Sequence, residues 1–552
     1  MTKWRSIAAR IAGVMGVTAL ALVPALPAHA ATYEPITGSG STWSQNALDQ
    51  WRANVKANYG MTVNYSGTGS TAGRQEFILG TVDFAVSEIP FQAKPEDGSV
   101  PENPGRGYAY APIVAGGTSF MYNLKIGGKQ VTNLRLSGEV ITKIFTGKIT
   151  NWNDAAIQAD NPGLAMPNKK ITPVIRSDGS GTTAQFTLWM SKQYPTLWSE
   201  FASSMGRGAG LTSQYPLFTG AKGQSGSNGV AGYVSQTYGE GAITYVEYSY
   251  ALKSGFPVAK VLNSSGYYIE PTAESVAVAL LSATINTDSS STDYLTQILD
   301  GVYNSGDARA YPLSSYSYMI VPTEVTGVFT AAKGNTLGTF MSYFLCEGQQ
   351  QAASLGYSPL PMNLVLAGFD QIKRIPGAES ANVDPNNCNN PTFKAGDSAS
   401  TNQLAKTAPQ PAACDKVGPD QCTTGTAGAL TSTAITGSGN GGSSSNAVAG
   451  GSGSTSASSS AGAGGGTAAA TGATDVTAVA AYDENGNVIA GAATAAGGAV
   501  FASPFTVGDG GWGWQQSTML AAVGFLLLAV IAPPTLMRVF RRPGGESKGV
   551  TR

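Results

Sequence analysis

Predicted strands and helices alternate along the part of the chain before residue 380. Residues 62–66 (T-V-N-Y-S) and 81–87 (T-V-D-F-A-V-S) have the composition of strands, and residues 74–79 (R-Q-E-F-I-L) between them are typical of a helix. This alternation indicates an α/β fold with a mainly parallel sheet. Farther along, apolar residues at helical spacing predict a core helix with Gly356 as its C-terminal cap; they are Leu337, Phe340, Met341, Phe344 and Leu345.

Three turns rich in glycine and hydroxyl residues each precede a predicted helix. They are residues 38–43 (G-S-G-S-T-W), 67–73 (G-T-G-S-T-A-G) and 174–186 (V-I-R-S-D-G-S-G-T-T-A-Q-F). The first amides of a helix have no partners within the helix and carry a partial positive charge. Each turn alone is also compatible with an ordinary N-cap. Together with the cation Arg176, three converging helix starts predict a site for an oxyanion.

Residues 1–30 have the pattern of a secretory signal peptide. A basic start is followed by an apolar segment over 11–23 and by an A-H-A cleavage motif at 28–30. The mature protein is therefore expected to begin near Ala31 and to lie outside the cell.

Cleavage there would also remove His29, the single histidine of the sequence. A chain without histidine has no Ser-His-Asp triad, no imidazole acid–base catalyst and no histidine-bearing metal site. Hydrolysis by paired carboxylates stays open in principle, but no motif supports it. We therefore predict a protein that is not an enzyme, with no catalytic residues, no metal and no cofactor. Because only 12% of the 552 residues are charged and the net charge is −1, a basic surface for nucleic acid is not expected either.

Four cysteines in an exported chain indicate two disulfides, for which three connectivities exist. Their spacing does not repeat the paired C-x-x-C of a zinc site. The expected pairs are Cys346–Cys388 and Cys414–Cys422, which would attach the segment after residue 380 to the preceding lobe.

The C-terminal part has the composition of a membrane tether. Residues 424–510 read as a disordered, low-complexity linker, because glycine, serine, threonine and alanine dominate their first half. Residues 511–537 contain no charged residue and are long enough for one transmembrane helix. Arg538 begins a basic tail over 538–552, which the positive-inside rule assigns to the cytoplasm. We expect a single-pass protein of the cell membrane with an extracellular binding domain.

Several segments, which follow one another in the same order as in a known family, carry a family resemblance. They are T-G-S-G-S-T-W, V-N-Y-S-G-T-G-S-T-A-G, T-V-D-F-A-V-S-E-I-P, I-F-T-G-K-I-T-N-W-N-D-A-A-I, V-I-R-S-D-G-S-G-T-T and G-A-I-T-Y-V-E-Y-S-Y-A. Together they make roughly the first 350 residues of the mature chain resemble the phosphate-binding proteins of bacterial ABC phosphate transporters. The linker and the predicted membrane helix lie outside the resemblance.

The resemblance implies a two-lobed clamp of the periplasmic-binding-protein type with phosphate bound between the lobes. The expected division is lobe 1 (31–115 and 310–380), lobe 2 (116–309) and a cysteine-containing extension (381–423).

By position, the resemblance assigns donors for phosphate to the three turns: Thr42 and Trp43, Ser70, and Arg176, Ser180, Gly181 and Thr182. Asp178 resembles the carboxylate that holds the arginine in place. Where the family has an aspartate that accepts the proton of bound phosphate, this chain has Glu88. Glutamate keeps the negative charge but is one methylene longer, so either the cage shifts or the affinity falls.

The function predicted from these features is capture of inorganic phosphate and delivery to the permease of an ABC transporter. Two alternatives remain open from the sequence. The long linker also suits a stalked surface protein that uses the fold for interaction, and Glu88 also suits a site for another tetrahedral oxyanion.

Overall fold

The computed structural model describes residues 33–378, 387–427 and 429, which all belong to one compact unit. Four predicted segments lie wholly or mostly outside these residues: the signal peptide (1–30), the linker (424–510), the transmembrane helix (511–537) and the cytoplasmic tail (538–552). None of the helices in the described ranges combines the length and the apolar character needed to cross a bilayer.

A mixed sheet of eight strands organises the described residues, in the spatial order β2-β1-β3-β15-β4-β10-β8-β9. Its strands are β1 (Ile36–Gly40), β2 (Val63–Ser66), β3 (Phe84–Ser87), β4 (Tyr108–Tyr122), β8 (Thr172–Arg176), β9 (Lys222–Gln224), β10 (Ala242–Glu247) and β15 (Ser314–Pro322). Shorter strands form small separate sheets: β5 (Lys125–Ile126), β6 (Lys129–Gln130), β7 (Arg135–Leu136), β11 (Lys260–Leu262), β12 (Tyr268–Ile269), β13 (Thr284–Ile285) and β14 (Gln297–Ile298).

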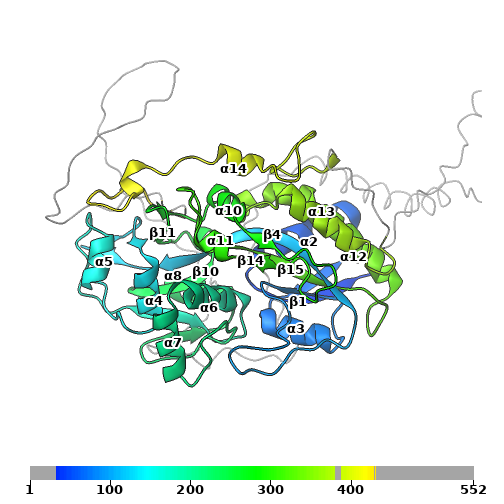
Figure 1. The fold of residues 1–552 in the computed structure, drawn as a ribbon, viewed down its shortest axis with the longest axis horizontal. Helices are drawn as coiled ribbons and strands as arrows, with labels where there is room; N and C mark the ends of the chain where they lie inside the picture. Colours follow the sequence, from blue (N-terminus) through cyan, green and yellow to red (C-terminus); the bar gives the residue numbers. More distant parts are fainter. Residues whose placement is uncertain (1–32, 379–386, 428, 430–552) are drawn as a thin grey trace, which may run out of the picture. The chain divides into compact units, whose positions relative to one another are not determined.

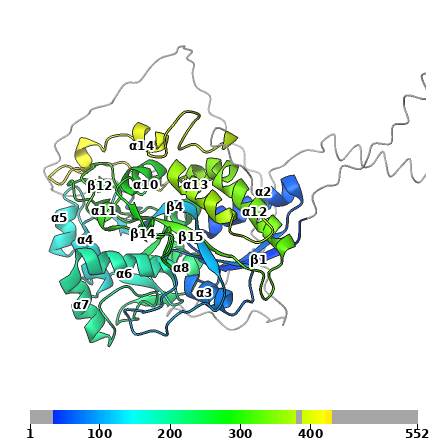
Figure 2. The ribbon, with the colours of Figure 1, turned by 45° about the vertical axis from the view of Figure 1, so that its right-hand side comes forward.

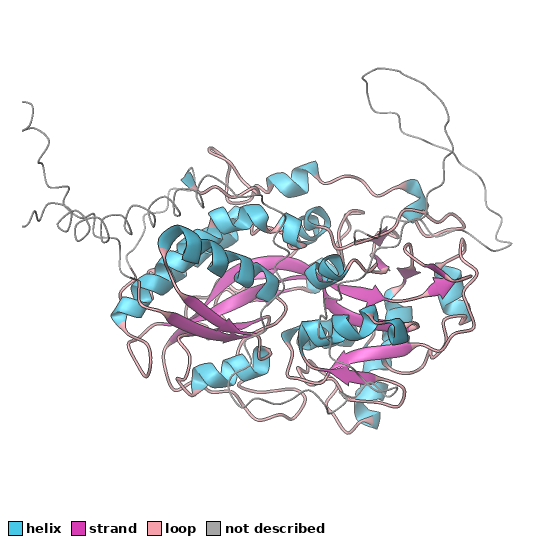
Figure 3. Cartoon of the chain, turned by 180° about the vertical axis from the view of Figure 1, so that it is seen from behind, coloured by secondary structure: helices cyan, strands magenta, loops and turns pink. Residues whose placement is uncertain are grey.

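Helices occupy most of the connections between the strands. They are α2 (Gln45–Tyr59), α3 (Ser70–Ile78), α4 (Gly138–Phe145), α5 (Ala155–Asp160), α6 (Gly181–Gln193), α7 (Pro195–Ser204), α8 (Gly226–Ser235), α9 (Tyr248–Ser254), α10 (Ala273–Leu280), α11 (Asp300–Tyr303), α12 (Ala331–Leu345), α13 (Met362–Ile372) and α14 (Gln403–Thr407). In the part around β1 and β15, α3 lies on one side of the strands and α12 and α13 lie on the other (Figures 1 and 2). Seen from behind, helices likewise flank the strands of the other part (Figure 3). The α/β fold expected from the sequence is confirmed.

Strand β4 belongs to both halves of the large sheet. Its residues 108–117 pair with β15, and its residues 118–122 pair with β10. The boundary predicted between lobe 1 and lobe 2, at residues 115 and 116, falls inside this strand. One continuous strand therefore connects the two parts of the molecule that carry the candidate site.

The sheet is less parallel than the sequence suggested. The outer pairs β1–β2, β1–β3, β8–β10 and β8–β9 are parallel, as expected for strands joined through helices. The central pairs β3–β15, β15–β4 and β4–β10 are antiparallel. The prediction of a mainly parallel sheet was therefore wrong at the centre. There β4 runs through both parts and β15 pairs with residues about 200 positions earlier, so neither strand follows the local strand–helix–strand repeat.

Two large hydrophobic cores lie on either side of this central region. The first is built mainly from residues before 115 and after 316, and it includes Trp51 stacked on Phe344 with ring centroids 5.4 Å apart. The second is built mainly from residues 120–313, and it includes Phe186 and Tyr245, 4.9 Å apart. Each part of the molecule therefore has a hydrophobic core of its own.

The extension after residue 387 lies against both parts. Near its start, Asn390 donates to the carbonyl of Leu360 at 3.1 Å. Its middle, α14, lies beside α10 (Figure 1). Farther on, Lys260 forms an ion pair with Asp415 at 2.7 Å, and Arg135 donates to the carbonyl of Asp420 at 2.8 Å.

Both expected disulfides, Cys346–Cys388 and Cys414–Cys422, are present, which confirms their pairing. The predicted cap at Gly356 is wrong for the helix to which it was assigned. That helix, α12, ends at Leu345, beside the disulfide-bonded Cys346, and Gly356 ends a short 3-10 helix instead.

We expect the two disulfides to differ in their effect on stability. In the chain-entropy picture, closing a separation of 42 residues (Cys346–Cys388) stabilises by about 4 kcal/mol, and closing one of 8 residues (Cys414–Cys422) by about 2.5 kcal/mol. The paired substitution of Cys346 and Cys388 by alanine should therefore lower the midpoint of urea unfolding more than the same change at Cys414 and Cys422. Equal losses, or the reverse order, would contradict this expectation.

Candidate functional site

Four helix starts meet where the two parts of the molecule touch. They are the turn before α2 and the first turns of α3, α6 and α8, and each follows directly after a strand of the large sheet. The carboxyl ends of parallel strands point to the same edge, so the turns that follow them gather there. All three turns singled out in the sequence are among the four.

Glu88 lies directly after β3 and is 1% exposed. The hydroxyl of Ser41 donates to Glu88 Oε1 at 2.5 Å, and the hydroxyl of Ser70 donates to Glu88 Oε2 at 2.8 Å. The amide of Trp43 in turn donates to Ser41 Oγ at 2.9 Å. The first two turns are thereby connected through one buried carboxyl group.

Arg176, at the end of β8, is 3% exposed and is held by Asp178. Its Nε donates to Asp178 Oδ1 at 2.7 Å, and its Nη2 donates to Asp178 Oδ2. The amide of Gly226 also donates to Asp178 Oδ1, at 2.9 Å. Burial opposes ionisation of Asp178, but the hydrogen bonds and charge of Arg176 outweigh it and lower the pKa of this carboxyl. The pair is a fixed cation whose carboxylate remains ionised at neutral pH.

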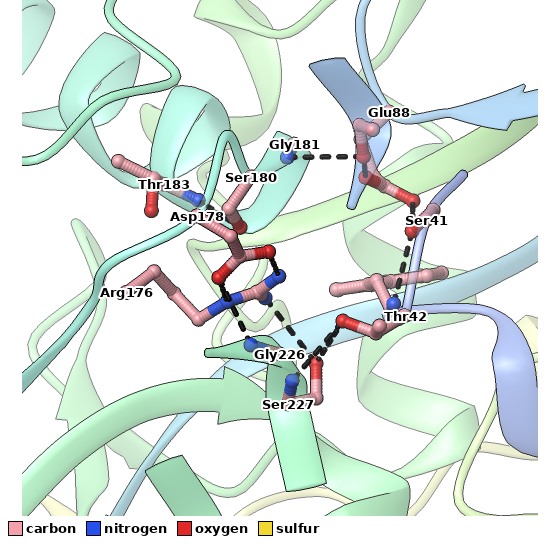
Figure 4. A network of polar contacts seen from close by, with 12 residues as sticks. Ser41, Thr42, Glu88, Arg176, Asp178, Ser180, Gly181, Thr183, Gly226 and Ser227 are labelled. Carbon is pink, nitrogen blue, oxygen red and sulfur yellow. Dashed lines mark hydrogen bonds and ion pairs between the residues drawn. The ribbon is translucent and has the colours of Figure 1, made fainter. Parts of the chain in front are cut away.

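Hydrogen bonds connect the two sides directly (Figure 4). Thr42 and Ser227 share a hydrogen bond of 2.9 Å between their hydroxyls, and the amide of Ser227 donates to Thr42 Oγ1 at 3.1 Å. The amide of Gly181 donates to Ser70 Oγ at 3.1 Å. The residues before α2 and α3 are therefore in contact with the starts of α6 and α8, as in a closed clamp.

A second contact between the two sides lies away from these residues. The hydroxyl of Thr212 donates to Asp97 Oδ2 at 2.5 Å, and the amide of Leu211 donates to Glu96 Oε2 at 3.0 Å. The carbonyl of Ser213 accepts from the amide of Ser180 at 2.9 Å, which ties this loop to the start of α6.

The start of α6 combines a cap with a hydroxyl that has no described partner. Ser180 Oγ accepts from the amide of Thr183 at 3.2 Å, so Ser180 is an N-cap and its own hydroxyl proton stays available. Thr182 is 1% exposed, and within the described residues its hydroxyl has no hydrogen-bond partner. Buried hydroxyls are normally bonded, so Thr182 Oγ1 is a candidate donor for a ligand.

The surroundings of the site favour an anion, although the site itself carries little net positive charge. The first turns of α3 and α6 direct the positive ends of their helix dipoles toward this place. Burial raises the pKa of the Glu88 carboxyl, although its hydrogen bonds with Ser41 and Ser70 and the charge of Arg176 act the other way. Glu88 therefore takes up a proton more readily than an exposed glutamate. Among the described residues, no group of three or more acidic, cysteine or histidine side chains could hold a metal ion.

The structure brings together all the residues chosen from the sequence and adds others. Ser41 and the pair Gly226 and Ser227 were not chosen, yet they bond to Glu88, Asp178 and Thr42. A signal for the second group was present: residues 223–229 read G-Q-S-G-S-N-G, the same kind of turn before a helix.

The chain is similar in sequence to known proteins over about 60% of its length. The family described as the PBP superfamily domain matches residues 25–347. The phosphate-binding protein PstS of Xylella fastidiosa (strain Temecula1) is 34% identical over 330 residues, which cover 60% of this chain and 82% of that protein. PstS of Pasteurella multocida is 32% identical over 340 residues, covering 60% and 88%.

Among solved structures, a putative phosphate ABC transporter substrate-binding protein from Clostridium perfringens with bound phosphate aligns with a TM-score of 0.40 and 18% identity. The alignment covers 59% of this chain and 100% of that chain.

Proposed function

From the premise that this chain belongs to the PstS phosphate-binding family of the PBP superfamily, we propose that it captures inorganic phosphate outside the cytoplasm and delivers it to the permease of an ABC transporter. The matched relatives are binding proteins by name, and the chain, like them, is not an enzyme. The observation that carries the proposal is the ion pair of the buried Arg176 with the partly buried Asp178, beside hydroxyls and amides from four helix starts.

In the proposed complex, phosphate enters between the two sides and exchanges its hydration shell for donors of the protein. Arg176 supplies the positive charge, and Asp178 keeps its guanidinium in position. The other donors are hydroxyls and amides of the three predicted turns: Thr42, Trp43, Ser70, Ser180, Gly181 and Thr182. Oriented donors of this kind suit a tetrahedral anion that presents oxygens in several directions.

Glu88 has a separate role in the proposal. Phosphate near neutral pH keeps a proton, which a carboxylate can accept, whereas sulfate has no proton to donate. A carboxylate facing sulfate would meet unpaired negative charge, and sites that depend on such a hydrogen bond discriminate by about 10⁴ to 10⁵. The raised pKa of Glu88 suits an acceptor of this proton.

The proposal also covers the attachment of the domain. Residues 1–30 would direct export, 424–510 would act as a flexible tether and 511–537 would anchor the chain in the cell membrane. The lobes (31–115 with 310–380, and 116–309) and the extension (381–423) would then lie on the outer side, and 538–552 in the cytoplasm.

The substitution Arg176→Ala tests the cation. It removes the positive charge and leaves the carboxylate of Asp178 unpaired beside the ligand, so phosphate binding should weaken by at least about 3 kcal/mol. Isothermal titration with phosphate measures the loss, and Arg374→Ala, at an exposed position, is the matched control. Affinity equal to that of the wild type would remove Arg176 from the site.

A second test concerns the choice between phosphate and sulfate. Glu88→Gln should lose the preference for phosphate, because an amide can donate to either anion, and Glu88→Asp should keep it. The quantity to measure is the ratio of the two dissociation constants, since the absolute affinity responds to several effects at once. If Glu88→Gln discriminates as well as the wild type, another group reads the proton.

The proposed anchor gives a third expectation. Deleting residues 511–552 should release the protein into the medium with its phosphate affinity unchanged, because the linker separates the binding domain from the membrane. Fractionation followed by titration measures both outcomes. A truncated protein that stays with the cells, or that binds phosphate poorly, would contradict the assigned boundary.

A further inference from the structure

Glu88 engages the hydroxyl of Ser70, which is a proposed donor to phosphate, and the hydroxyl of Ser41, which lies next to the proposed donor Thr42. Both of its carboxylate oxygens accept hydrogen bonds, Oε1 from Ser41 at 2.5 Å and Oε2 from Ser70 at 2.8 Å. All three residues are 1% exposed, so water competes little for these bonds. Bonds from a hydroxyl to a buried carboxylate are among the stronger hydrogen bonds in proteins.

Proton counting shows that these hydroxyls are fully committed. A serine hydroxyl has one proton to donate. Ser70 uses that proton for Glu88, while its oxygen accepts from the amide of Gly181 at 3.1 Å. Ser41 likewise donates to Glu88, and its oxygen accepts from the amide of Trp43 at 2.9 Å. Neither serine can donate to an additional anion unless Glu88 gives up its bond.

The position of the Glu88 carboxylate is also one that an anion would favour. A methyl group added at Gly181 would lie 1.9 Å from Glu88 Oε2, so the carboxylate is packed directly on the first residue of α6. Ser70, its other neighbour, is the first residue of α3. The carboxylate therefore lies between two helix N-termini, where their dipoles stabilise negative charge.

We infer that Glu88 is an internal anion that competes with phosphate for the hydroxyls of Ser41 and Ser70, so that the reach of its side chain sets the affinity of the site. This inference rests on the proposed function. Phosphate gains the two hydroxyls only when Glu88 releases them and turns one oxygen toward the proton of the ligand. The affinity is lowered by the bonds that Glu88 must break.

Shortening the side chain separates the two roles of Glu88. An aspartate keeps a carboxylate that can accept the proton of the ligand, but it is one methylene shorter and cannot reach Ser41, Ser70 and the surface of Gly181 together. Glu88→Asp in the full-length chain should therefore bind inorganic phosphate at least about tenfold more tightly than the wild type, as expected when a competing hydrogen bond is lost. Isothermal titration measures the change, and Glu76→Asp on α3 is the matched control, which should leave the affinity unchanged.

A second measurement follows the internal contact without any ligand. In phosphate-free buffer, the stabilities of the wild type, Glu88→Ala, Ser70→Ala and the double variant form a thermodynamic cycle, and a contact between the two side chains makes their effects non-additive. Additive losses would overturn the internal contact. This arm remains informative if Glu88→Asp fails to fold.

The outcomes separate this inference from the proposed function. Tighter binding by Glu88→Asp, together with coupling between Glu88 and Ser70, supports both. If the wild type binds phosphate and Glu88→Asp binds it equally well or more weakly, the competition is overturned and the proposed function stands. Failure of the wild type and of Glu88→Asp to bind phosphate overturns the proposed function and the competition with it.

Discussion

The ion pair between Arg176 and Asp178 is the interaction on which the candidate site depends. A guanidinium that is 3% exposed is costly to bury unless a carboxylate and further hydrogen bonds compensate it. Asp178 supplies two contacts to the guanidinium, and the amide of Gly226 holds Asp178 from the start of α8. Because Gly226 is also next to Ser227, the partner of Thr42, the same small group of bonds orients the cation and connects the two sides of the molecule.

The sequence predicted those features of the fold that depend on neighbours along the chain. Alternation of strands and helices indicated the α/β fold, and glycine- and hydroxyl-rich turns marked the regions where α3 and α6 begin. Helix α3 nevertheless starts at Ser70, within its turn and four residues before the predicted segment 74–79. The sequence did not predict the antiparallel centre of the sheet, because β4 and β15 are joined by pairings between residues about 200 positions apart in the chain. The local pattern of a strand does not tell which distant strand it meets.

The same limit explains which site residues were missed. Thr42 was recognised from its turn, but its partner Ser227 lies 185 residues away, in a turn of the same kind that was not singled out from the sequence. Ser41 stood beside Thr42 in a recognised turn and was still overlooked, because its role depends on the direction of its hydroxyl toward Glu88. Family resemblance selected Glu88 as an acceptor and Ser70 as a donor to phosphate. The hydrogen bonds that Ser41 and Ser70 donate to Glu88 became visible only from the packing of the segments that carry these three residues.

The charges at the site do not by themselves favour an anion. Arg176 is balanced by Asp178, whose pKa is lowered, and Glu88 adds a second carboxyl group nearby. Attraction for phosphate must therefore come from oriented donors and helix dipoles, whose contribution is large only where water is excluded. The affinity of such a site therefore depends on whether its donors are already hydrogen-bonded to groups of the protein. A serine hydroxyl engaged by Glu88 contributes nothing to a ligand until it is released, so the length of one side chain affects the affinity without changing the net charge of the site.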